Sequence, residues 1–404
     1  MMASELVPLE QALDHILSNA LPMDETEVVL VTESLGRALA SDLEVPADVP
    51  PADNSSVDGY ALRCEDLGGG AILPVSARIP AGQAPAPLKP GTAVRIFTGA
   101  SIPEGADAVV MQEDVKITPE GIRAPSETTL GQNIRRQGQD LAAGTLALAR
   151  GVLIRPQEMG LIASLGLDRV PVYRRFRVAV LTTGDELVEP GQPLKPGQIH
   201  NTNAPTLRGL LAQMNCDLVM CETVRDIRSA TSDALKAASE LADLIVTSGG
   251  VSVGEEDHIR TVLESEGELT LWRLAIKPGK PLAFGKLNGT PLLGLPGNPA
   301  SVLVTFLMVG VPYIRRRQGL VNAPVIGERL PAAFSVDRPS IRREFMRARK
   351  EQVNGQYVVT IYPNQSSGVL SSACWANGLA VIPEHSTVAP GESITFYGFH
   401  ELTG

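Results

Sequence analysis

The residues most able to do chemistry lie in one stretch, residues 243–258, where an apolar run leads into glycines and then into acids. The run 244–246 is typical of a buried parallel strand. Ser-Gly-Gly follows at 248–250, and paired glycines let backbone N–H groups face a ligand with no side chain in the way. Acids at 255–257 close the stretch. The pattern indicates a phosphorylated ligand carrying a divalent cation, and a tight glycine turn with solvated acids is the alternative.

Two further loops offer carboxylates at the ends of neighbouring expected strands. Glu186 follows the first of these strands and Asp226 the second. Ligands bind beyond the carboxyl ends of strands in open α/β sheets, so Glu186, Asp226 and Asp257 should share one cleft. Crowded carboxylates repel, and a hard cation with oxygen ligands compensates them. Mg²⁺ fits because it keeps waters and takes one or two carboxylates beside phosphate oxygens, whereas no grouping of His and Cys suggests zinc.

Basic groups suited to an anion follow further along the chain. Lys277 and Lys280 lie on a Pro-Gly turn, whose rigidity favours an anion site over a pair of solvated lysines. The Leu-Pro-Gly-Asn-Pro run at 295–299 directs a helix N-terminus toward the same edge. The segments 342–347 and 364–368 add arginine, serine and amide donors that could bind an oxyanion.

Three polar turns lie in the first part of the chain. Residues 53–60 carry Asx and Ser side chains that cap their own backbone, so Asp58 is held before a sharp glycine turn and could present its carboxylate to a ligand. Thr98 ends an expected strand, and the turn 131–140 places two arginines beside Asp140. Capped, solvated turns are the ordinary interpretation of all three.

The composition excludes several classes of protein. A formal charge of −10 argues against a general nucleic-acid binder, so any anionic ligand needs local basic groups. No uncharged apolar run is long enough to span a membrane, and the acidic N-terminus differs from a secretory signal, which predicts a cytoplasmic protein with no membrane partner. The four cysteines have no paired spacing, so we expect them to be reduced and structural.

The chain is too long for one core, since cores stop growing at about 250–300 residues and this chain has 404. Short apolar runs separated by Gly and Pro predict a small β domain between residues 72 and 147, and similar runs beyond 324 predict another. Between them, strands alternate with helices in the pattern of a doubly wound parallel sheet. Strands are expected at 178–182, 218–221, 244–247 and 271–276, and helices at 204–214, 230–242, 257–264 and 299–313.

Seven motifs resemble those of the MoeA-type molybdopterin molybdenumtransferases, the family that includes the C-terminal E-domain of gephyrin. Two departures are modest: Val57 stands where the family usually has Met, and Ile227 stands where a second Asp is common. The motifs keep the family's order, at 53–60 (D-N-S-x-x-D-G-Y), 98–100 (T-G-A), 133–140, 183–187 (T-G-D-E-L), 248–257 (S-G-G-V-S-V-G-x-x-D), 277–280 (K-P-G-K) and 295–299 (L-P-G-N-P).

The resemblance implies a multidomain α/β fold of four parts and insertion of molybdenum from molybdate into adenylylated molybdopterin, with release of AMP. It also implies a homodimer whose clefts draw on both subunits, with the adenylyltransferase and apo-molybdoenzymes as further partners. The parts are an N-terminal α/β linking domain (1–48 and 141–175), an inserted, mostly β domain (49–140), a Rossmann-like molybdopterin-binding domain with a doubly wound, MoaB/MogA-type sheet (176–322) and a small C-terminal β domain (323–404).

The resemblance gives individual residues roles as well. Glu186, Asp226 and Asp257 would hold Mg²⁺ and the phosphates. The other catalytic residues, acting from the facing subunit, would be Asp58, Thr98 and Asp140. Molybdate would be received by Lys277, Lys280, Ser367 and an arginine of the run 342–347, either Arg342 or Arg347. The remaining expected contacts of the pterin nucleotide are Thr183, Gly184, Asp185, Ser248, Gly249, Gly250, Ser252, Gly254, Pro296, Gly297 and Asn298.

Two other functions are open from the sequence. A molybdopterin adenylyltransferase would share the 176–322 fold, but such a chain is expected to be shorter and to lack the 53–60 motif and the C-terminal part. A non-catalytic scaffold is the second, since gephyrin also clusters receptors. The full set of acids and basic turns argues against the loss of catalysis.

Overall fold

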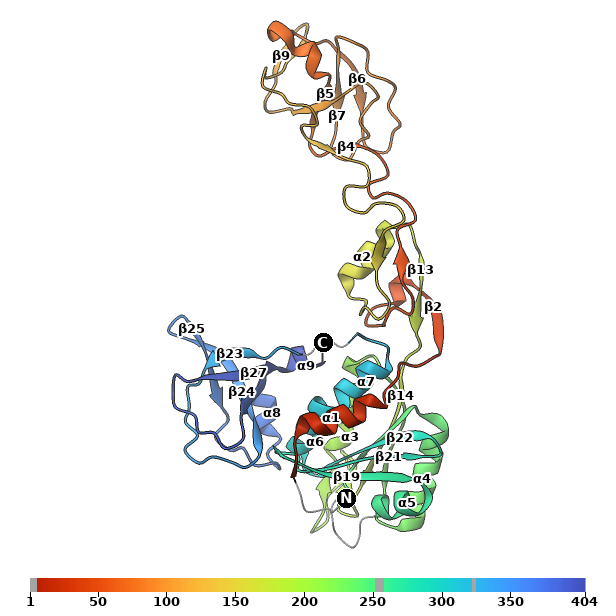
Figure 1. Ribbon diagram of the computed structural model, residues 1–404, viewed down its shortest axis with the longest axis vertical. Helices are drawn as coiled ribbons and strands as arrows, with labels where there is room; N and C mark the ends of the chain where they lie inside the picture. Colours follow the sequence, from red (N-terminus) through yellow and green to blue (C-terminus); the bar gives the residue numbers. More distant parts are fainter. Residues whose placement is uncertain (1–5, 251–257, 322–324, 404) are drawn as a thin grey trace.

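The computed structural model describes residues 6–250, 258–321 and 325–403 of the chain. Figure 1 shows an elongated molecule, in which a large α/β part and a C-terminal β part lie side by side at one end and an arm of two smaller parts extends from them. The chain enters the arm after its first helix and later returns to the α/β part. Within the described residues, no helix is long and apolar enough to cross a bilayer.

Seven strands form the central sheet in the order β1-β19-β21-β22-β18-β14-β17. The last four in this order run parallel, so their carboxyl ends meet at one edge. β21 is antiparallel to both its neighbours. The doubly wound α/β fold is confirmed, but the sheet is mixed rather than parallel, because Asn288 and Gly289, both at positive φ, close a hairpin between β21 and β22. The bounds are Leu6–Val7 (β1), Arg177–Thr183 (β14), Asp217–Val224 (β17), Leu244–Ser248 (β18), Glu268–Leu274 (β19), Pro281–Leu287 (β21) and Thr290–Leu295 (β22).

Helices cover both faces of this sheet, and the alternation of side chains along the strands accounts for two separate cores. Val178 and Val180 of β14 belong to the core beneath α1, α3, α6 and α7, whereas Ala179 and Leu181 belong to the core beneath α4 and α5. The single helix predicted at 299–313 is α6 and α7 joined by a π-helical turn, η3. The bounds are Leu9–Ser18 (α1), Asn203–Gln213 (α3), Arg228–Leu241 (α4), His258–Glu266 (α5), Pro299–Thr305 (α6), Phe306–Gly310 (η3) and Val311–Arg317 (α7).

The first helix belongs to the α/β part, which differs from the linking domain implied for residues 1–48. Leu9, Ala12 and Ile16 form its apolar face and are buried in the same core as the sheet. β1 pairs with β19 and adds the start of the chain to the edge of that sheet. Periodicity in the sequence predicts such a helix, but it does not identify the surface that the helix covers.

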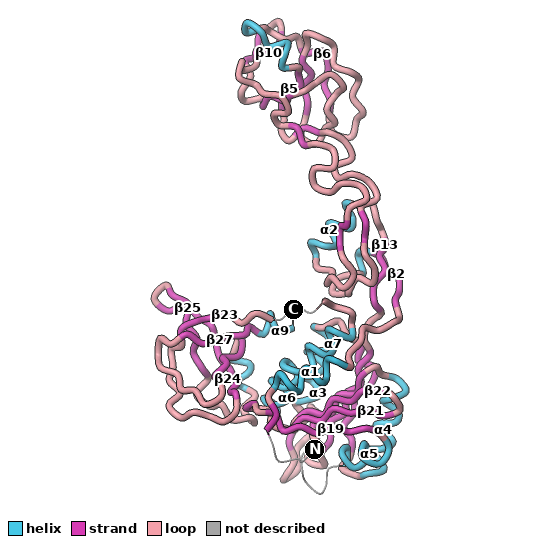
Figure 2. The backbone as a smooth tube through the Cα atoms, in the orientation of Figure 1, coloured by secondary structure: helices cyan, strands magenta, loops and turns pink. Residues whose placement is uncertain are grey.

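The near half of the arm is a linking unit with its own small core, which includes Leu39, Ile154 and Val172. β2 pairs with β13, and β3 pairs with β12 (Figure 2). β12 therefore lies outside the small β domain predicted for residues 72–147. The bounds are Thr26–Leu30 (β2), Val31–Glu33 (η1), Leu43–Glu44 (β3), Leu146–Leu148 (β12), Pro156–Ser164 (α2) and Arg169–Tyr173 (β13).

The far half of the arm is an inserted unit built on a four-stranded sheet, β6-β7-β5-β8. Its β character confirms the prediction from short apolar runs. Tyr60 and Leu62 of β5 face one apolar cluster, and Ala61 faces the other. The bounds are Asn54–Ser55 (β4), Gly59–Leu62 (β5), Cys64–Gly70 (η2), Val75–Ile79 (β6), Ala93–Ile96 (β7), Ala108–Met111 (β8), Lys116–Thr118 (β9), Gly121–Arg123 (β10) and Ile134–Arg135 (β11).

The C-terminal part is a β sheet that includes one short strand, β20, from the α/β segment of the chain. β20 follows β19 of the central sheet and pairs with β24, so that Lys277 lies opposite Glu344. This crossing joins the two parts at the edge where the parallel strands end. The bounds are Ile276–Lys277 (β20), Glu328–Pro331 (β23), Arg343–Val353 (β24), Gln356–Ile361 (β25), Ser371–Trp375 (α8), Gly378–Ile382 (β26), Ser393–Gly398 (β27) and Phe399–Thr403 (α9).

Candidate active site

A cavity of about 870 Å³ opens at the carboxyl ends of β14, β18 and β22, where the α/β part meets the C-terminal part. Its wall combines the glycine loops, two acids and the basic turn that the sequence singles out. The predicted site residues that line it are Thr183, Gly184, Glu186, Asp226, Ser248, Gly249, Gly250, Lys277, Lys280, Pro296, Gly297, Asn298, Arg342 and Ser367.

Other predicted site residues lie elsewhere. Asp185 and Arg347 are not part of the cavity lining as far as the structure describes it. Ser252, Gly254 and Asp257 fall outside the described residues. The three remaining predictions lie in the arm: Asp58 directly precedes β5, Thr98 follows β7, and the Asp140 backbone bonds to Val49, where the chain enters the inserted unit.

The acids at one end of the cavity are held by the loops that follow β14 and β17. Gly184 has φ +147°, and a Cβ there would meet the Glu186 carboxylate at 2.6 Å, so the glycine leaves room for that carboxylate to lie close to the backbone. Asp185 Oδ1 accepts a 3.1 Å hydrogen bond from the backbone N–H of Asp226. Asp185 thus joins the two acid-bearing loops.

These acids offer the oxygen ligands of a hard cation. Glu186 and Asp226 line the same wall, and phosphate oxygens of a bound substrate would complete the coordination that Mg²⁺ prefers. Within the described ranges, which omit Asp257, no group of three or more His, Cys, Asp or Glu forms a preassembled metal centre. Two carboxylates on one wall fit a hard cation that also binds substrate oxygens.

The glycine loop after β18 approaches β14 closely. Gly249 has φ +90°, and a Cβ there would lie 2.9 Å from both the backbone oxygen and Oγ1 of Thr183. Gly250 has φ +65°, and a Cβ there would meet Ile259 at 2.8 Å. Both the conformation and the available space therefore require glycine at these positions.

Asn203, at the start of α3, connects the two loops that form the floor of the cavity. Its Nδ2 donates to Ser248 Oγ at 2.8 Å and to the Gly297 carbonyl oxygen at 2.7 Å. Ser248 Oγ in turn donates to the Pro296 carbonyl oxygen at 3.2 Å. Sequence reasoning missed Asn203, and the only signal was a run of polar residues, 200–203, ahead of the helix. Lining residues outside the predicted segments are Ile199, His200, Thr202, Pro281 and Ser301, whereas Leu187, Pro278, Gly279, Pro299, Gln365 and Ser366 belong to segments that the sequence predicts for the site.

The two lysines at the basic end have different surroundings. Lys277 Nζ lies 3.0 Å from Glu344 Oε1, and Glu344 is buried. Part of the Lys277 charge is therefore already compensated. Lys280 also lines the cavity and has no ion pair with any residue that the structure describes.

The two candidate arginines also differ. Arg342 lines the cavity and donates to the Ile276 carbonyl oxygen at 3.3 Å. Arg347 is 1% exposed and donates to Ser372 Oγ at 3.0 Å and to the Ser366 carbonyl oxygen at 3.1 Å. Burial lowers the pKa of Arg347 to about 10. Arg347 thus supports the loop that carries Ser367, and Arg342 is the arginine that reaches the cavity.

In the inserted unit, Asp58 and Thr98 form a compact exposed pair. Asp58 Oδ1 accepts hydrogen bonds from the backbone N–H and the hydroxyl of Thr98, both at 2.8 Å. These two bonds hold the pKa of Asp58 below its ordinary value. Asp140 is exposed, and its backbone N–H donates to the Val49 carbonyl oxygen at 3.0 Å. Among the described residues, none between 49 and 140 lines the cavity.

An α/β sheet with glycine loops at its parallel carboxyl ends, acids on one side and basic groups on the other, is typical of enzymes that bind phosphorylated ligands. Family models identify the family within this class of enzymes. Residues 7–166 match "MoeA N-terminal region (domain I and II)", residues 179–316 match "Probable molybdopterin binding domain", and residues 329–399 match "MoeA C-terminal region (domain IV)". The chain belongs to the MoeA family of molybdopterin molybdenumtransferases.

Individual relatives agree over nearly the full length. A molybdopterin molybdenumtransferase of Haemophilus influenzae is 40% identical over 414 aligned positions, which cover 99% of this chain and 100% of that protein. Gephyrin of Dictyostelium discoideum is 31% identical, over 96% of this chain and 62% of its own length. The crystal structure of a molybdopterin biosynthesis MoeA protein from Pyrococcus horikoshii has a TM-score of 0.83 at 31% identity, with 97% of this chain and 100% of that chain covered.

Proposed function

We propose that the protein transfers molybdenum from molybdate to adenylylated molybdopterin and that water cleaves the phosphoanhydride bond in the same site, which releases AMP and leaves the phosphate on the pterin. The observation that carries this proposal is one cavity of about 870 Å³ with carboxylates at one end and, at the other, the ammonium group of Lys280, which has no ion pair among the described residues. Carboxylates can bind a phosphate through a shared cation, whereas molybdate needs positively charged groups around it. The two ends of the cavity therefore suit the two substrates. The Haemophilus influenzae relative, which this chain matches over its full length, is named a molybdopterin molybdenumtransferase, and that name supports the transfer of molybdenum.

At the acid end, Glu186 and Asp226 would hold Mg²⁺ together with the substrate's phosphate oxygens, and we expect Asp257 to contribute as a third ligand. The bound ion would supply Lewis-acid assistance at the phosphate. Gly249 and Gly250 would bring backbone N–H groups close to the same phosphates. Asn203 would keep these loops in place through its contacts with Ser248 and Gly297.

At the basic end, Lys280, Arg342 and Ser367 would hold molybdate beside the dithiolene of the pterin. The transfer requires the two sulfur atoms to displace oxygen ligands of a tetrahedral dianion, so the protein contributes mainly position and charge compensation. Lys277 would contribute less than Lys280, because Glu344 already pairs with it.

We further propose that the protein acts as a homodimer, in which the arm of one subunit reaches the cavity of the other. Asp58, Thr98 and Asp140 would then complete the site from the facing subunit. Their distance along the arm from their own cavity supports this arrangement (Figure 1). In the cytoplasm, an adenylyltransferase would supply the substrate and apo-molybdoenzymes would receive the product.

The reaction itself is tested by measuring AMP release from purified adenylylated molybdopterin, with and without molybdate and Mg²⁺. We expect release to depend on both ions and to accompany formation of a molybdenum-bearing pterin. Formation of adenylylated molybdopterin from molybdopterin and ATP, without consumption of the adenylylated form, would instead assign the adenylyltransferase reaction. Absence of both reactions in a folded dimer would favour a scaffold.

The shared site is tested by mixing Asp58→Ala and Glu186→Ala subunits, each inactive as a homodimer. One of the two cavities of a mixed dimer would then keep both residues, so about half of the activity per mixed dimer should return. Mixed dimers of Asp58→Ala with Asp58→Ala/Glu186→Ala subunits are the control, since neither of their cavities is intact. No recovery in purified mixed dimers would contradict the shared site while leaving the reaction unaffected.

A further inference from the structure

The arm joins the α/β part through hydrogen bonds and the packing of the Tyr173 ring against Gly319. The chain crosses this junction twice, ahead of β2 and between β13 and β14. The core of the linking unit and the core of the sheet have no residue in common. Beyond the two crossings, Asn215 Nδ2 donates to the Leu35 carbonyl oxygen and the Val321 N–H donates to the Gly151 carbonyl oxygen, both at 3.0 Å. Joints without a large apolar interface allow relative motion of the parts.

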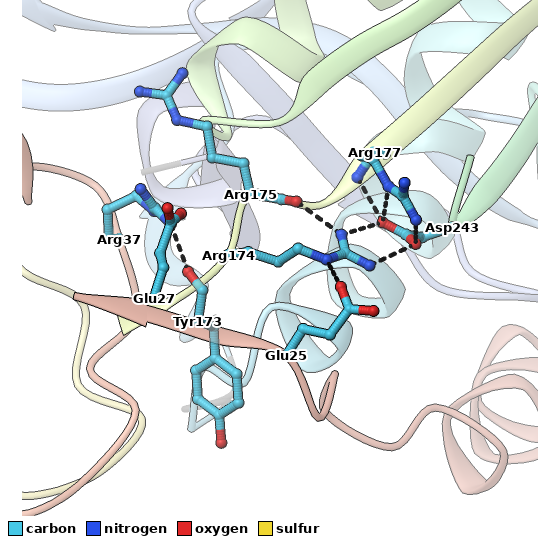
Figure 3. Close-up of polar contacts among 8 residues, drawn as sticks. All are labelled: Glu25, Glu27, Arg37, Tyr173, Arg174, Arg175, Arg177 and Asp243. Atoms are coloured by element: carbon cyan, nitrogen blue, oxygen red, sulfur yellow. Dashed lines mark hydrogen bonds and ion pairs between the residues drawn. The ribbon is translucent and has the colours of Figure 1, made fainter. Parts of the chain in front are cut away.

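Arg174 crosses this junction with its side chain, as Figure 3 shows. Its backbone N–H donates to the Glu25 carbonyl oxygen at 3.2 Å and so extends the β2–β13 ladder of the arm by one step. Its Nη1 and Nη2 donate to the two carboxylate oxygens of Asp243 at 2.6 and 2.8 Å. Its Nε pairs with the Glu25 carboxylate. Arg174 is thus bonded to the arm on one side and to the sheet on the other.

Asp243 is firmly held on the sheet side. It precedes β18, and Arg177 begins the neighbouring β14. The Arg177 N–H donates to Asp243 Oδ2 at 2.8 Å, and its Nη2 donates to Oδ1 at 3.0 Å. The Asp243 side chain is only 10% exposed. The fork-on-fork geometry of Arg174 with this fixed carboxylate permits one orientation, which a single point charge would not impose.

We infer that Arg174 is a positioning residue for the reaction, because its bond to Asp243 sets the angle at which the arm leaves the sheet. The inference rests on the shared site proposed above, in which the arm delivers Asp58 and Thr98 to the facing cavity. A small rotation at the base of an elongated arm becomes a larger displacement at its tip. A displacement of about 1 Å at reacting groups can reduce a rate about a hundredfold.

The test compares Arg174→Ala with Arg177→Ala in the full-length dimer. Both substitutions remove a guanidinium from the same carboxylate, but only Arg174 reaches across from the arm, whereas Arg177 belongs to the sheet. We expect Arg174→Ala to lower kcat of molybdate-dependent AMP release at least tenfold, while the affinity for adenylylated molybdopterin changes less than twofold. Arg177→Ala should leave both within twofold. Small-angle scattering should show a broader range of dimer dimensions for Arg174→Ala alone.

Arg174→Lys separates positioning from folding. Compared with Arg174→Ala it keeps a positive charge but lacks the two-pronged guanidinium, so it should recover part of kcat. A kcat of folded Arg174→Ala within twofold of the natural protein overturns the inference, as does an equal loss in Arg177→Ala. If Arg174→Ala does not fold, unchanged kcat in Arg174→Lys overturns it. Failure of the natural protein to release AMP would overturn the proposed reaction instead, and unchanged scattering of Arg174→Ala would independently remove the orienting role.

Discussion

The two ends of the central sheet are built differently, although β14 and β18 reach both. At the carboxyl ends, Thr183 and Ser248 lead into glycines, and the buried Asn203 Oδ1 has no hydrogen-bond partner among the described residues. At the amino ends, the Asp243 carboxylate accepts hydrogen bonds from two guanidinium groups and a backbone N–H. At the carboxyl ends, polar groups line the cavity. At the amino ends, the polar groups bond to one another within the chain.

This difference predicts that substitutions at the two ends have separable effects. At the ligand end, a changed residue that has no partner within the described chain should alter binding or turnover with little effect on stability, because no internal bond is lost. At the junction end, a changed residue should alter stability or the position of the arm with little effect on affinity. Each of the following measurements tests whether the two kinds of effect remain separate.

The largest expected effect is that of Gly249→Ala. The new Cβ would meet Thr183 at 2.9 Å in a backbone conformation at φ +90°, so the loop must shift away from the phosphate position. We expect turnover to fall about a hundredfold or more. Gly191→Ala is the matched control, because Gly191 has φ +93° but open space around it. Equal loss in both variants, measured by AMP release and thermal unfolding, would indicate general backbone strain and contradict the specific role.

The second effect separates the two lysines of the ligand end. Lys280→Ala should raise the molybdate concentration for half-maximal turnover about tenfold to a hundredfold, since a charge-assisted contact contributes about 1.5–3 kcal/mol. Lys277→Ala should raise it less and lower the melting temperature, because Glu344 would remain buried without its partner. The check is a molybdate titration at saturating adenylylated molybdopterin. Equal shifts in both variants would show that Glu344 releases Lys277 when molybdate binds.

The sequence predicts the ligand end far better than the junction end. Glycines at a strand end and lysines on a Pro-Gly turn act through local backbone conformation. A short stretch of sequence is therefore enough to predict their role. Arg174 and Asp243 are 69 positions apart, and neither belongs to a motif. Their contact depends on how the arm meets the sheet, which short-range patterns do not encode.

The same distinction applies within the cavity. The sequence does not distinguish Arg342 from Arg347. In the structure, Arg342 precedes β24 and lines the cavity, whereas Arg347 lies within β24 and is buried behind the loop of Ser367. Asn203 escaped prediction because its contacts are with two loops from other strands. Sequence patterns therefore identified the loops of the site. The side chains that hold these loops in place could be identified only from the tertiary structure.

The smallest expected effect concerns the junction end and its dependence on pH. Burial alone would raise the pKa of Asp243, but the hydrogen bonds from Arg174 and Arg177 outweigh it and hold the pKa at about 2, against an ordinary value of 3.8. A carboxyl group with a lowered folded-state pKa stabilises the fold fully above its unfolded-state pKa, so this contribution is complete above about pH 4 and is lost as the pH falls toward 2.

A pKa difference of this size corresponds to about 2.5 kcal/mol, and about 1 kcal/mol remains after allowance for solvent screening around the partly open cluster. Asp243→Asn should therefore lower the melting temperature of the α/β part at pH 7 by a few degrees, and its difference from the natural protein should shrink steadily between pH 4 and pH 2. Asp217→Asn is the control, since Asp217 is half exposed and its ion pair with Arg175 is longer, at 3.6 Å. A difference for Asp243→Asn that persists unchanged at pH 2 would mean that shape rather than charge holds this end of the sheet.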